Sequence, residues 1–162
     1  MAQSNIYLKL DGLDGESDDK DHKDWIEVES FSWGVSNPAS FAIGKGGQAT
    51  QAHVAAISIQ KRCDKASVAM FKACTTGKHI PKGIISCMKL DGDTRVEYLK
   101  IDLTDIMVEG LSWSGSGGEH LIHESVSFVF AEFKESYKVQ EDKGSAGGAT
   151  DFGFNIQSSV AT

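Results

Sequence analysis

Apolar and polar residues alternate along most of this chain with a period of two. Successive side chains of a β-strand point to opposite sides of the sheet, so this alternation indicates strands with one buried face. The pattern predicts an all-β fold with one α-helix, built as a sandwich of two packed sheets or as a small β-barrel. The runs predicted as strands cover residues 5–10, 53–60, 84–90, 95–103 and 121–139.

The last of these runs, LIHESVSFVFAEFKESYKV, carries apolar residues on both faces. A strand that is apolar on both faces needs a cover on each side. One cover is the core of the chain itself, and a neighbouring subunit is a possible source of the other. Val126, Phe128 and Phe130 share one face, while Leu121, Val129, Phe133, Tyr137 and Val139 share the other.

The run WIEVESFSWG changes phase along its length. Ile26 and Val28 fall on one face, but Phe31 and Trp33 fall on the opposite one. Either both faces are covered, or a bulge between these pairs resets the alternation. In both cases Ser32 points away from the two aromatic residues, towards a surface that is small and polar.

One segment, DKASVAMFKACTTG, has the spacing of a helix. Asp64 or Ser67 is suited to the N-cap, and Gly77 is suited to the C-cap. A helix of this length buries one apolar face against a sheet. The residues expected on that face are Ala66, Ala69, Met70, Ala73 and Cys74.

Three irregular segments separate the predicted elements, at residues 11–24, 35–50 and 141–150. Loops longer than about 12 to 15 residues are usually functional or disordered. The first is rich in aspartate but lacks the spacing of a calcium-binding loop, so we expect a solvated charged loop. The second is aperiodic and contains glycine and serine.

Composition restricts the classes of partner. The net charge of −7 argues against a nucleic-acid partner and against direct binding to an anionic membrane. No run approaches the roughly 20 apolar residues of a spanning helix. The start, MAQSNIYLKLDG, has neither the basic nor the apolar region of a signal peptide, so we expect synthesis in the cytoplasm. With 162 residues the chain is expected to form a single domain, residues 1–162.

The cysteines have no spacing typical of a metal site or a disulfide framework. Cys63 and Cys74 flank the predicted helix, whose rise of about 1.5 Å per residue separates them by roughly 16 Å, too far for a disulfide. We therefore expect Cys63, Cys74 and Cys87 to be free, buried or half-buried thiols.

The stretch EHLIHE at residues 119–124 suggests a zinc site at first sight. Its order HxxHE matches neither HExxH nor HxxEH, and residues three apart on a strand point to opposite faces. The glycine-rich GKGG and the TTGKH run lack the spacing of a phosphate-binding loop, and no signature of a nucleophilic enzyme is found. We expect no enzyme activity, no metal and no cofactor.

Several longer motifs together resemble the haemolysin-coregulated protein (Hcp) family, the inner-tube subunits of bacterial type VI secretion systems. They span nearly the whole chain in order, and their combination is far more specific than any one alone. One departure is Val68, where many relatives have proline at the helix start. The matching motifs are IYLKLDGLDGES, DKDHKDWIEVESFSWG, KRCDKASVAMFKACTTGKHI, VEYLKIDLTDIMV, GSGGEHLIHESVSFVFAEFKESY and DFGFNIQ.

The resemblance implies a barrel-like fold whose copies close into hexameric rings, which stack into a hollow tube. It implies a contractile sheath around the tube, a valine–glycine-repeat spike at its tip, and small effector proteins carried and chaperoned in the lumen. Tube subunits leave the cell through the type VI apparatus, which accommodates secretion without a signal peptide. No fused C-terminal effector is expected after Thr162.

Ser32 is the candidate for the lumen wall that contacts cargo. Residues of the long loop are candidates for contacts between protomers or stacked rings, because its glycines permit close backbone approach. A mobile surface loop is the alternative for that segment. The loop candidates are Ser36, Asn37, Ser40, Phe41, Gly44, Lys45, Gly46 and Gly47, and the residues of structural family motifs are Trp33, Gly34, Asp64, Ser67, Gly77, Lys78 and His79.

Two other interpretations remain open at this stage. The chain could be a monomeric β-sandwich that binds a ligand, since tryptophans and glycine-rich loops serve such modules too. It could also be the tail-tube protein of a phage or of a related contractile injector.

Overall fold

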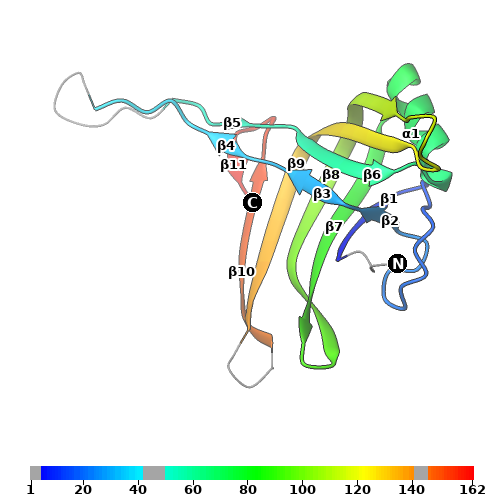
Figure 1. Cartoon of the computed structure of the whole chain (residues 1–162). Helices are drawn as coiled ribbons and strands as arrows, with labels where there is room; N and C mark the ends of the chain where they lie inside the picture. The colour runs from blue at the N-terminus through cyan, green and yellow to red at the C-terminus, as the bar shows by residue number, and fades with distance from the viewer. Residues whose placement is uncertain (1–4, 42–49, 141–145) are drawn as a thin grey trace.

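The computed structural model describes residues 5–41, 50–140 and 146–162 of the chain. It is an all-β fold with one helix, as predicted (Figure 1). No helix in these ranges is long and apolar enough to cross a membrane. The elements are β1 (Ile6–Leu10), β2 (Ile26–Val28), β3 (Ser30–Ser32), β4 (Val35–Ser36), β5 (His53–Val54), β6 (Ile57–Arg62), α1 (Lys65–Thr76), β7 (Ile80–Asp91), β8 (Thr94–Ser114), β9 (His123–Gln140), β10 (Ala146–Asn155) and β11 (Val160–Ala161).

The sheet closes on itself as a barrel. Neighbouring strands follow the order β11-β10-β9-β8-β7-β1-β2, while β6 pairs with both β9 and β3. The short β2–β3 segment completes the circle, because β2 pairs with β1 and β3 pairs with β6. Between these two strands, the Glu29 amide donates to the Gln60 carbonyl at 2.8 Å. Closure leaves the barrel wall without a gap at this point.

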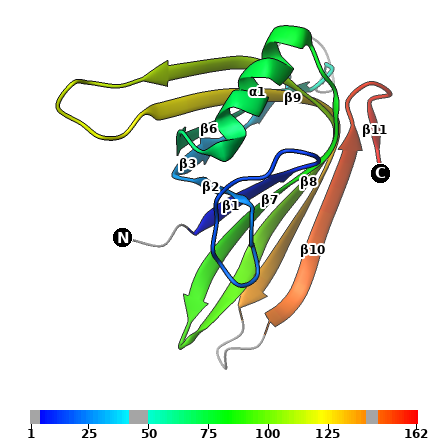
Figure 2. The ribbon, with the colours of Figure 1, turned by 90° about the vertical axis from the view of Figure 1, so that its right-hand side faces the viewer.

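Strand β9 divides one of its edges between two partners. Residues 123–128 pair with β6, and residues 132–140 pair with β10. Strand β8 runs along the other edge of β9 for most of its length. The sheet therefore forks at the middle of β9, with β6 and β3 on one branch and β10 and β11 on the other (Figure 2).

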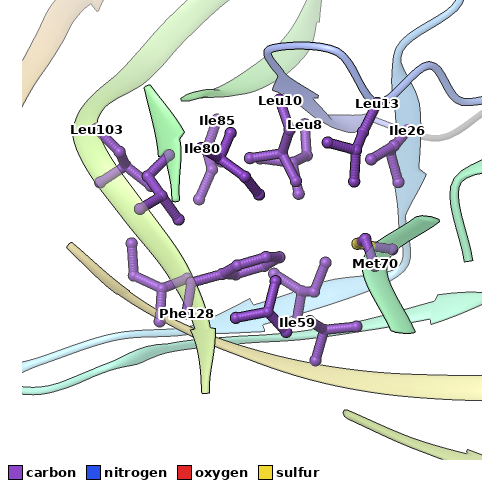
Figure 3. Close-up of a cluster of buried hydrophobic side chains, with 14 of the residues drawn as sticks. Leu8, Leu10, Leu13, Ile26, Ile59, Met70, Ile80, Ile85, Leu103 and Phe128 are labelled. Atoms are coloured by element: carbon purple, nitrogen blue, oxygen red, sulfur yellow. The ribbon is translucent and has the colours of Figure 1, made fainter. Parts of the chain in front are cut away.

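The core fills the barrel with aliphatic side chains and one central aromatic ring. Leu8, Ile85 and Leu103 face Ile59 and Phe128 across the interior (Figure 3). Each of these side chains is at most 2% exposed. At about 25 cal/mol per Å² of apolar area removed from water, this burial is the main stabilising term of the fold.

A bend at Asp105 reverses which residues of β8 point inward. Ile101 and Leu103 are buried before it, and Ile106 and Val108 are buried after it. Asp105 has φ 54, a left-handed conformation that breaks the alternation without changing the pairing register with β9. Its carboxylate lies 2.6 Å from Nδ1 of His79.

The same bend explains why β9 is apolar on both faces. Phe130 and Phe133 are both buried although they fall on opposite faces of a regular strand. For Phe133 the cover comes from within the chain, including Trp33 and Phe154. The need for an outside cover is therefore limited to the exposed Val129, Tyr137 and Val139 of β9.

The phase change in the WIEVESFSWG run arises at Glu29. This residue forms a bend between β2 and β3, as one of the two predicted alternatives required. Ile26 and Val28 are buried on one side of the bend, while Phe31 beyond it is half-buried against the same core. Ser32 is exposed, so its side chain leaves the core.

Helix α1 begins and ends as its sequence predicts. Asp64 is the N-cap and forms a capping box with Ser67, and Gly77 ends the helix with φ 65. Met70 is fully buried in the core. Ala69 is exposed, contrary to prediction, because it turns towards the outer side of the helix. The three cysteines are free thiols, and burial raises the pKa of Cys87 to about 11.

Replacing Met70 with alanine should destabilise the protein by about 2–5 kcal/mol, because it leaves a cavity in the core beneath α1. The control is Val68→Ala on the same helix, where the side chain is 71% exposed and the change should stay within about 0.5 kcal/mol. Urea denaturation followed by circular dichroism measures both. Equal effects of the two substitutions would contradict this assignment of the helix faces.

Candidate functional site

Hydroxyl side chains form a surface on the outside of the barrel branch made by β3, β6, β9 and β8. Ser32 pairs with Ser58, and Ser58 pairs in turn with Ser127 on β9. Paired residues of neighbouring strands point to the same side of a sheet. Ser32, predicted from the sequence to face outward, is thus the first member of a row of serines. We call this row and the row beside it the hydroxyl face.

The second row of the hydroxyl face lies beside the first. Ser30 pairs with Gln60, Gln60 with Ser125, and Ser125 with Ser112. Nε2 of Gln60 donates to Oγ of Ser125 at 2.9 Å. These residues alternate with buried ones such as Ile59 and Val126, so the sequence runs ISIQ and ESVSF already contained the signal that identifies them.

Charge is confined to the margins of the hydroxyl face. Nε of Arg62 lies 2.7 Å from Oε1 of Glu29, which neutralises both groups at one end. Glu109 accepts a hydrogen bond from Ser127 at 3.4 Å on another side. The two central rows carry only hydroxyl and amide groups, which can both donate and accept hydrogen bonds.

The sheet branch that carries the hydroxyl face has open edges. Within the described residues, β3 pairs only with β6. The pairing of β7 with β8 ends at Ile106, so residues 107–114 of β8 have a strand partner, β9, on one edge only. Exposed edges of this kind present backbone groups that can pair with another chain.

A narrow ribbon leaves the barrel next to Ser32 and forms an arm (Figure 1). Its base is fixed by Trp33, whose Nε1 donates to the Ala55 carbonyl at 3.0 Å, and by the Ala55 amide, which donates to the Gly34 carbonyl at 2.9 Å. Strands β4 and β5 then pair Val35 with Val54. Trp33 itself packs edge-on against Phe133.

The described part of the arm beyond β4 is exposed. Ser36, Asn37, Ser40 and Phe41 are all at the surface, and Phe41 is 85% exposed. The other four loop candidates, at residues 44–47, lie outside the described residues. Phe41 is thus a large apolar side chain exposed to water at the end of the described part of the arm.

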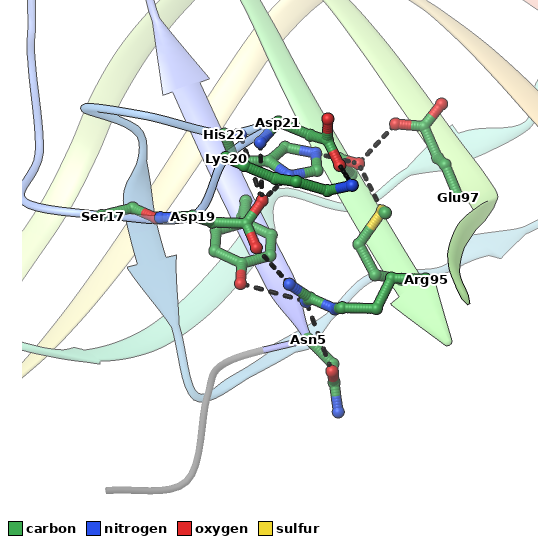
Figure 4. A network of polar contacts seen from close by, with 11 residues as sticks. Asn5, Ser17, Asp19, Lys20, Asp21, His22, Arg95 and Glu97 are labelled. Atoms are coloured by element: carbon green, nitrogen blue, oxygen red, sulfur yellow. Dashed lines mark hydrogen bonds and ion pairs between the residues drawn. The ribbon is translucent and has the colours of Figure 1, made fainter. Parts of the chain in front are cut away.

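The acidic segment 11–24 is only in part the solvated loop predicted from its composition, because it also carries a buried polar cluster (Figure 4). Asp19 and His22 are buried at 7% and 4% exposure. Nδ1 of His22 lies 2.9 Å from Oδ1 of Asp19, and Nε2 lies 3.0 Å from Oγ of Ser86 on β7. The prediction is wrong for Asp19, whose partner Arg95 lies far away in the sequence. It holds for the exposed acidic residues of the segment, Asp14, Glu16, Asp18, Asp21 and Asp24.

Arg95, from the start of β8, completes this buried cluster. It donates to Oδ2 of Asp19 and, at 3.0 Å, to the hydroxyl of Tyr7. The Tyr7 ring stacks on His22 with centroids 4.4 Å apart. Burial alone would raise the pKa of Asp19, but hydrogen bonds from the His22 side chain and the Asp21 amide, with the charge of Arg95, outweigh burial and lower this pKa below its ordinary value.

A second buried polar cluster lies beneath the N-terminus of α1. Lys61 and Glu124 are fully buried, with Nζ and Oε2 3.6 Å apart. Nζ of Lys61 also donates to Oδ1 of Asp64 at 2.9 Å and to Oγ of Ser67 at 3.1 Å. Glu124, the second glutamate of the EHLIHE stretch that suggested a zinc site, is therefore an ion-pair partner inside the fold.

The histidines of that stretch stay near the surface. His120 precedes β9 and His123 is its first residue, with Nε2 3.8 Å from Oε2 of Glu119. In the part of the chain that the structure describes, no group of three or more His, Cys, Asp or Glu side chains is placed to hold a metal ion.

The remaining motif residues lie at the C-terminus of α1. The Lys78 amide donates to the Ala73 carbonyl at 3.0 Å after the turn at Gly77. Nδ1 of His79 lies within hydrogen-bond distance of Oδ1 of Asp105 on β8. These residues join the helix end to the bend in β8.

Asp19→Asn should lower the free energy of unfolding at pH 7 by about 1–3 kcal/mol, because Arg95 and His22 lose a buried charged acceptor. A carboxylate whose pKa is lowered by folding stabilises the protein above its ordinary pKa of 3.8, and this stabilisation is lost as the pH falls through the lower folded value. The variant should therefore lose part of the acid dependence of stability below about pH 5.

The control for this prediction is Asp18→Asn, since Asp18 is the exposed neighbour of Asp19. Denaturation curves recorded from pH 7 to pH 2.5 provide the comparison. Identical pH profiles for the Asp19 variant and the unmodified protein would contradict the role given to this carboxylate.

Comparison with known proteins agrees with these features. A family model described as "Type VI secretion system effector, Hcp" matches residues 7–137. The protein hcp1 of Pseudomonas aeruginosa is 36% identical over 157 residues, which covers 96% of this chain and 97% of that protein. Both matches extend over the barrel, α1 and the hydroxyl face.

Solved structures give the same result. A structure described as a type six secretion system protein superposes with a TM-score of 0.91 at 29% identity, covering 99% of this chain and 100% of that one. Hcp1 from Salmonella typhimurium superposes with a TM-score of 0.80 at 35% identity, covering 97% of each chain. The chain therefore belongs to the Hcp family of type VI secretion proteins.

Proposed function

We propose that this chain is the tube subunit of a type VI secretion system, in which copies close into hexameric rings and the rings stack into a hollow tube. The observation that carries the proposal is the sheet branch β3-β6-β9-β8. It is apolar towards the core, lined with hydroxyl groups on the other side, and open at both edges within the described residues. Its role is structural and involves no catalysis.

Edge pairing between copies explains how such a branch becomes a ring. The two open edges, β3 and residues 107–114 of β8, belong to opposite sides of the same branch. Joining one edge to the other edge of the next copy is a head-to-tail contact, and such contacts close into rings when the rotation between copies permits. Closure also removes the exposed edges, which would otherwise promote aggregation.

In this ring the hydroxyl face lines the lumen. Ser32, Ser58 and Ser127 then form part of a wall without charge at its centre, against which small effector proteins travel. Short hydroxyl side chains leave room for cargo and supply hydrogen bonds to it. The chain is made in the bacterial cytoplasm and leaves the cell through the apparatus whose sheath surrounds it and whose spike caps it.

The arm forms contacts with neighbouring copies in the ring or stack. Ser36, Asn37, Ser40 and Phe41 supply its described surface, and the candidates Gly44, Lys45, Gly46 and Gly47 lie outside the described residues. A partner that covers Phe41 removes a large apolar side chain from water, which is favourable by about 1.5–3 kcal/mol for full burial.

The purified protein should give rings of six 17.5 kDa protomers in native mass spectrometry, with a central hole in negative-stain electron microscopy. Phe41→Ser should reduce the assembled fraction without altering the circular dichroism spectrum, because the Phe41 side chain is 85% exposed. A stable, well-folded monomer at micromolar concentration would contradict the tube and favour a monomeric binding module.

Ser32→Gln should leave rings intact but reduce the retention of a co-expressed small effector several-fold, because the longer side chain narrows the lumen where cargo lies. Ser32→Ala is the matched control, since it removes a hydroxyl without adding volume. Co-purification of the effector on tagged rings measures both variants. Unchanged retention with the Gln variant would remove Ser32 from the cargo surface.

A further inference from the structure

The outer face of α1 combines apolar and basic side chains at the surface. Lys65, Val68 and Lys72 are exposed at the spacing of one helix face, and Val68 is 71% exposed. At the margin of this face Phe71 lies against Trp113 of β8, with ring centroids 5.2 Å apart. Both rings remain open to solvent, at 48% and 45% exposure. We call these five residues the α1 patch.

Large aromatic side chains on a helix of a folded domain are usually buried. Here the buried face of α1 is already complete, because Ala66, Met70 and Ala73 occupy the core. Phe71 and Trp113 therefore form a second apolar surface that the chain itself leaves half uncovered. Exposed aromatic pairs surrounded by polar groups are characteristic of binding surfaces.

The charge of the α1 patch is opposite to that of the protein. The chain carries a net charge of −7, yet the stretch from Lys65 to Lys78 contains three lysines and no acidic residue. Among the described residues, none of these lysines forms an ion pair. The nearby carboxylates have other partners, since Asp64 contacts Lys61 and Asp105 contacts His79.

The patch and the hydroxyl face lie on opposite sides of the barrel wall. Met70 of α1 packs into the core beside Ile59 and Phe128, which alternate along their strands with Ser58 and Ser127. The serines therefore point away from the helix. When the hydroxyl face lines a lumen, the outer face of α1 points away from it, to the outside of the tube.

We propose that the α1 patch is the docking surface for an acidic, amphipathic segment of a different protein that lies against the outer wall of the tube. This inference rests on the proposed tube for the direction in which the patch points, but not for its chemistry. The partner supplies carboxylates to Lys65 and Lys72 and an apolar side chain to the aromatic pair formed by Phe71 and Trp113.

A second copy of this chain is the alternative occupant of the patch. Exposed Leu90 of β7 shortly precedes Asp93 in the turn between β7 and β8, and exposed Leu121 and Ile122 follow Glu119, so these surfaces also combine apolar and acidic side chains. The measurement of ring formation in the patch variants distinguishes this occupant from a different protein.

The test uses two synthetic amphipathic helical peptides with leucine along one face. One has glutamate on both flanks of that face, and the other has lysine at the same positions. Binding to the intact protein is followed by tryptophan fluorescence, with Trp113→Phe to identify the reporter, and by calorimetry. The glutamate peptide should bind, the lysine peptide should not, and affinity should fall several-fold between about 50 and 300 mM NaCl.

Two variants of the patch complete the test. Lys65→Glu combined with Lys72→Glu, and separately Phe71→Ser, should each weaken the glutamate peptide by about tenfold or more while leaving ring formation unchanged. The matched control is Lys134→Glu combined with Lys138→Glu, which makes the same change of charge on exposed residues of β9 and should leave binding unaltered.

Absence of binding, equal binding of the two peptides, or binding unaffected by the patch variants would overturn the inference. Loss of rings in the Lys65 and Lys72 variant, with an unchanged circular dichroism spectrum, would also overturn it by showing that a second copy covers the patch. If the unmodified protein forms no rings, the proposed tube fails, and the peptide measurements still decide whether the patch binds acidic segments.

Discussion

The strict alternation of side chains in the β3-β6-β9-β8 branch is the constraint on which the rest of this molecule depends. Ile57, Ile59, Val126 and Phe128 must point inward to fill the barrel. The residues that alternate with them must then point outward, and in this sequence they are Ser58, Gln60, Ser125 and Ser127. The hydroxyl face is thus a direct consequence of how the core is packed, and a slip of one residue would exchange the two faces.

The bend at Asp105 determines where that alternation changes its direction. Before it, β8 buries Ile101 and Leu103, and after it the strand buries Ile106 and Val108. The pairing register with β9 is unchanged across this bend, and it shifts once further along the strand, at the bulge between Val108 and Gly110. The side chains of β9 beyond the barrel, Tyr137 and Val139, keep the inward direction of the first branch but have no core beneath them.

The sequence predicted the elements that depend on local pattern. The central β-runs, α1 and its two caps, and the phase change before Phe31 all follow from spacing within about ten residues. The misread parts depend on partners distant in the chain. Asp19 is buried because Arg95 donates a hydrogen bond to its carboxylate, and the His22 ring beside it contacts the Ser86 hydroxyl. Composition alone could not identify those partners.

The same reason explains what the sequence left open about two correctly predicted faces. Phe133 is covered by Trp33, which is 100 residues away in the numbering, so periodicity could report its face but not its cover. Ser32 was recognisable as polar and outward, but only the register joins it to Ser58 and Ser127. Sequence pattern identifies single members of such a surface, and strand pairing is needed to assemble them.

The two buried polar clusters have a role that apolar packing cannot fill. A buried ion pair adds little net stability compared with apolar side chains of the same volume, but loss of one partner is costly. Lys61 with Glu124 therefore allows one placement of the start of α1, and Asp19 with Arg95 allows one placement of the segment over β1 and β7. Neither cover is built on the residues of the hydroxyl face, so the two clusters fix α1 and the segment 11–24 while that face stays open within the described residues.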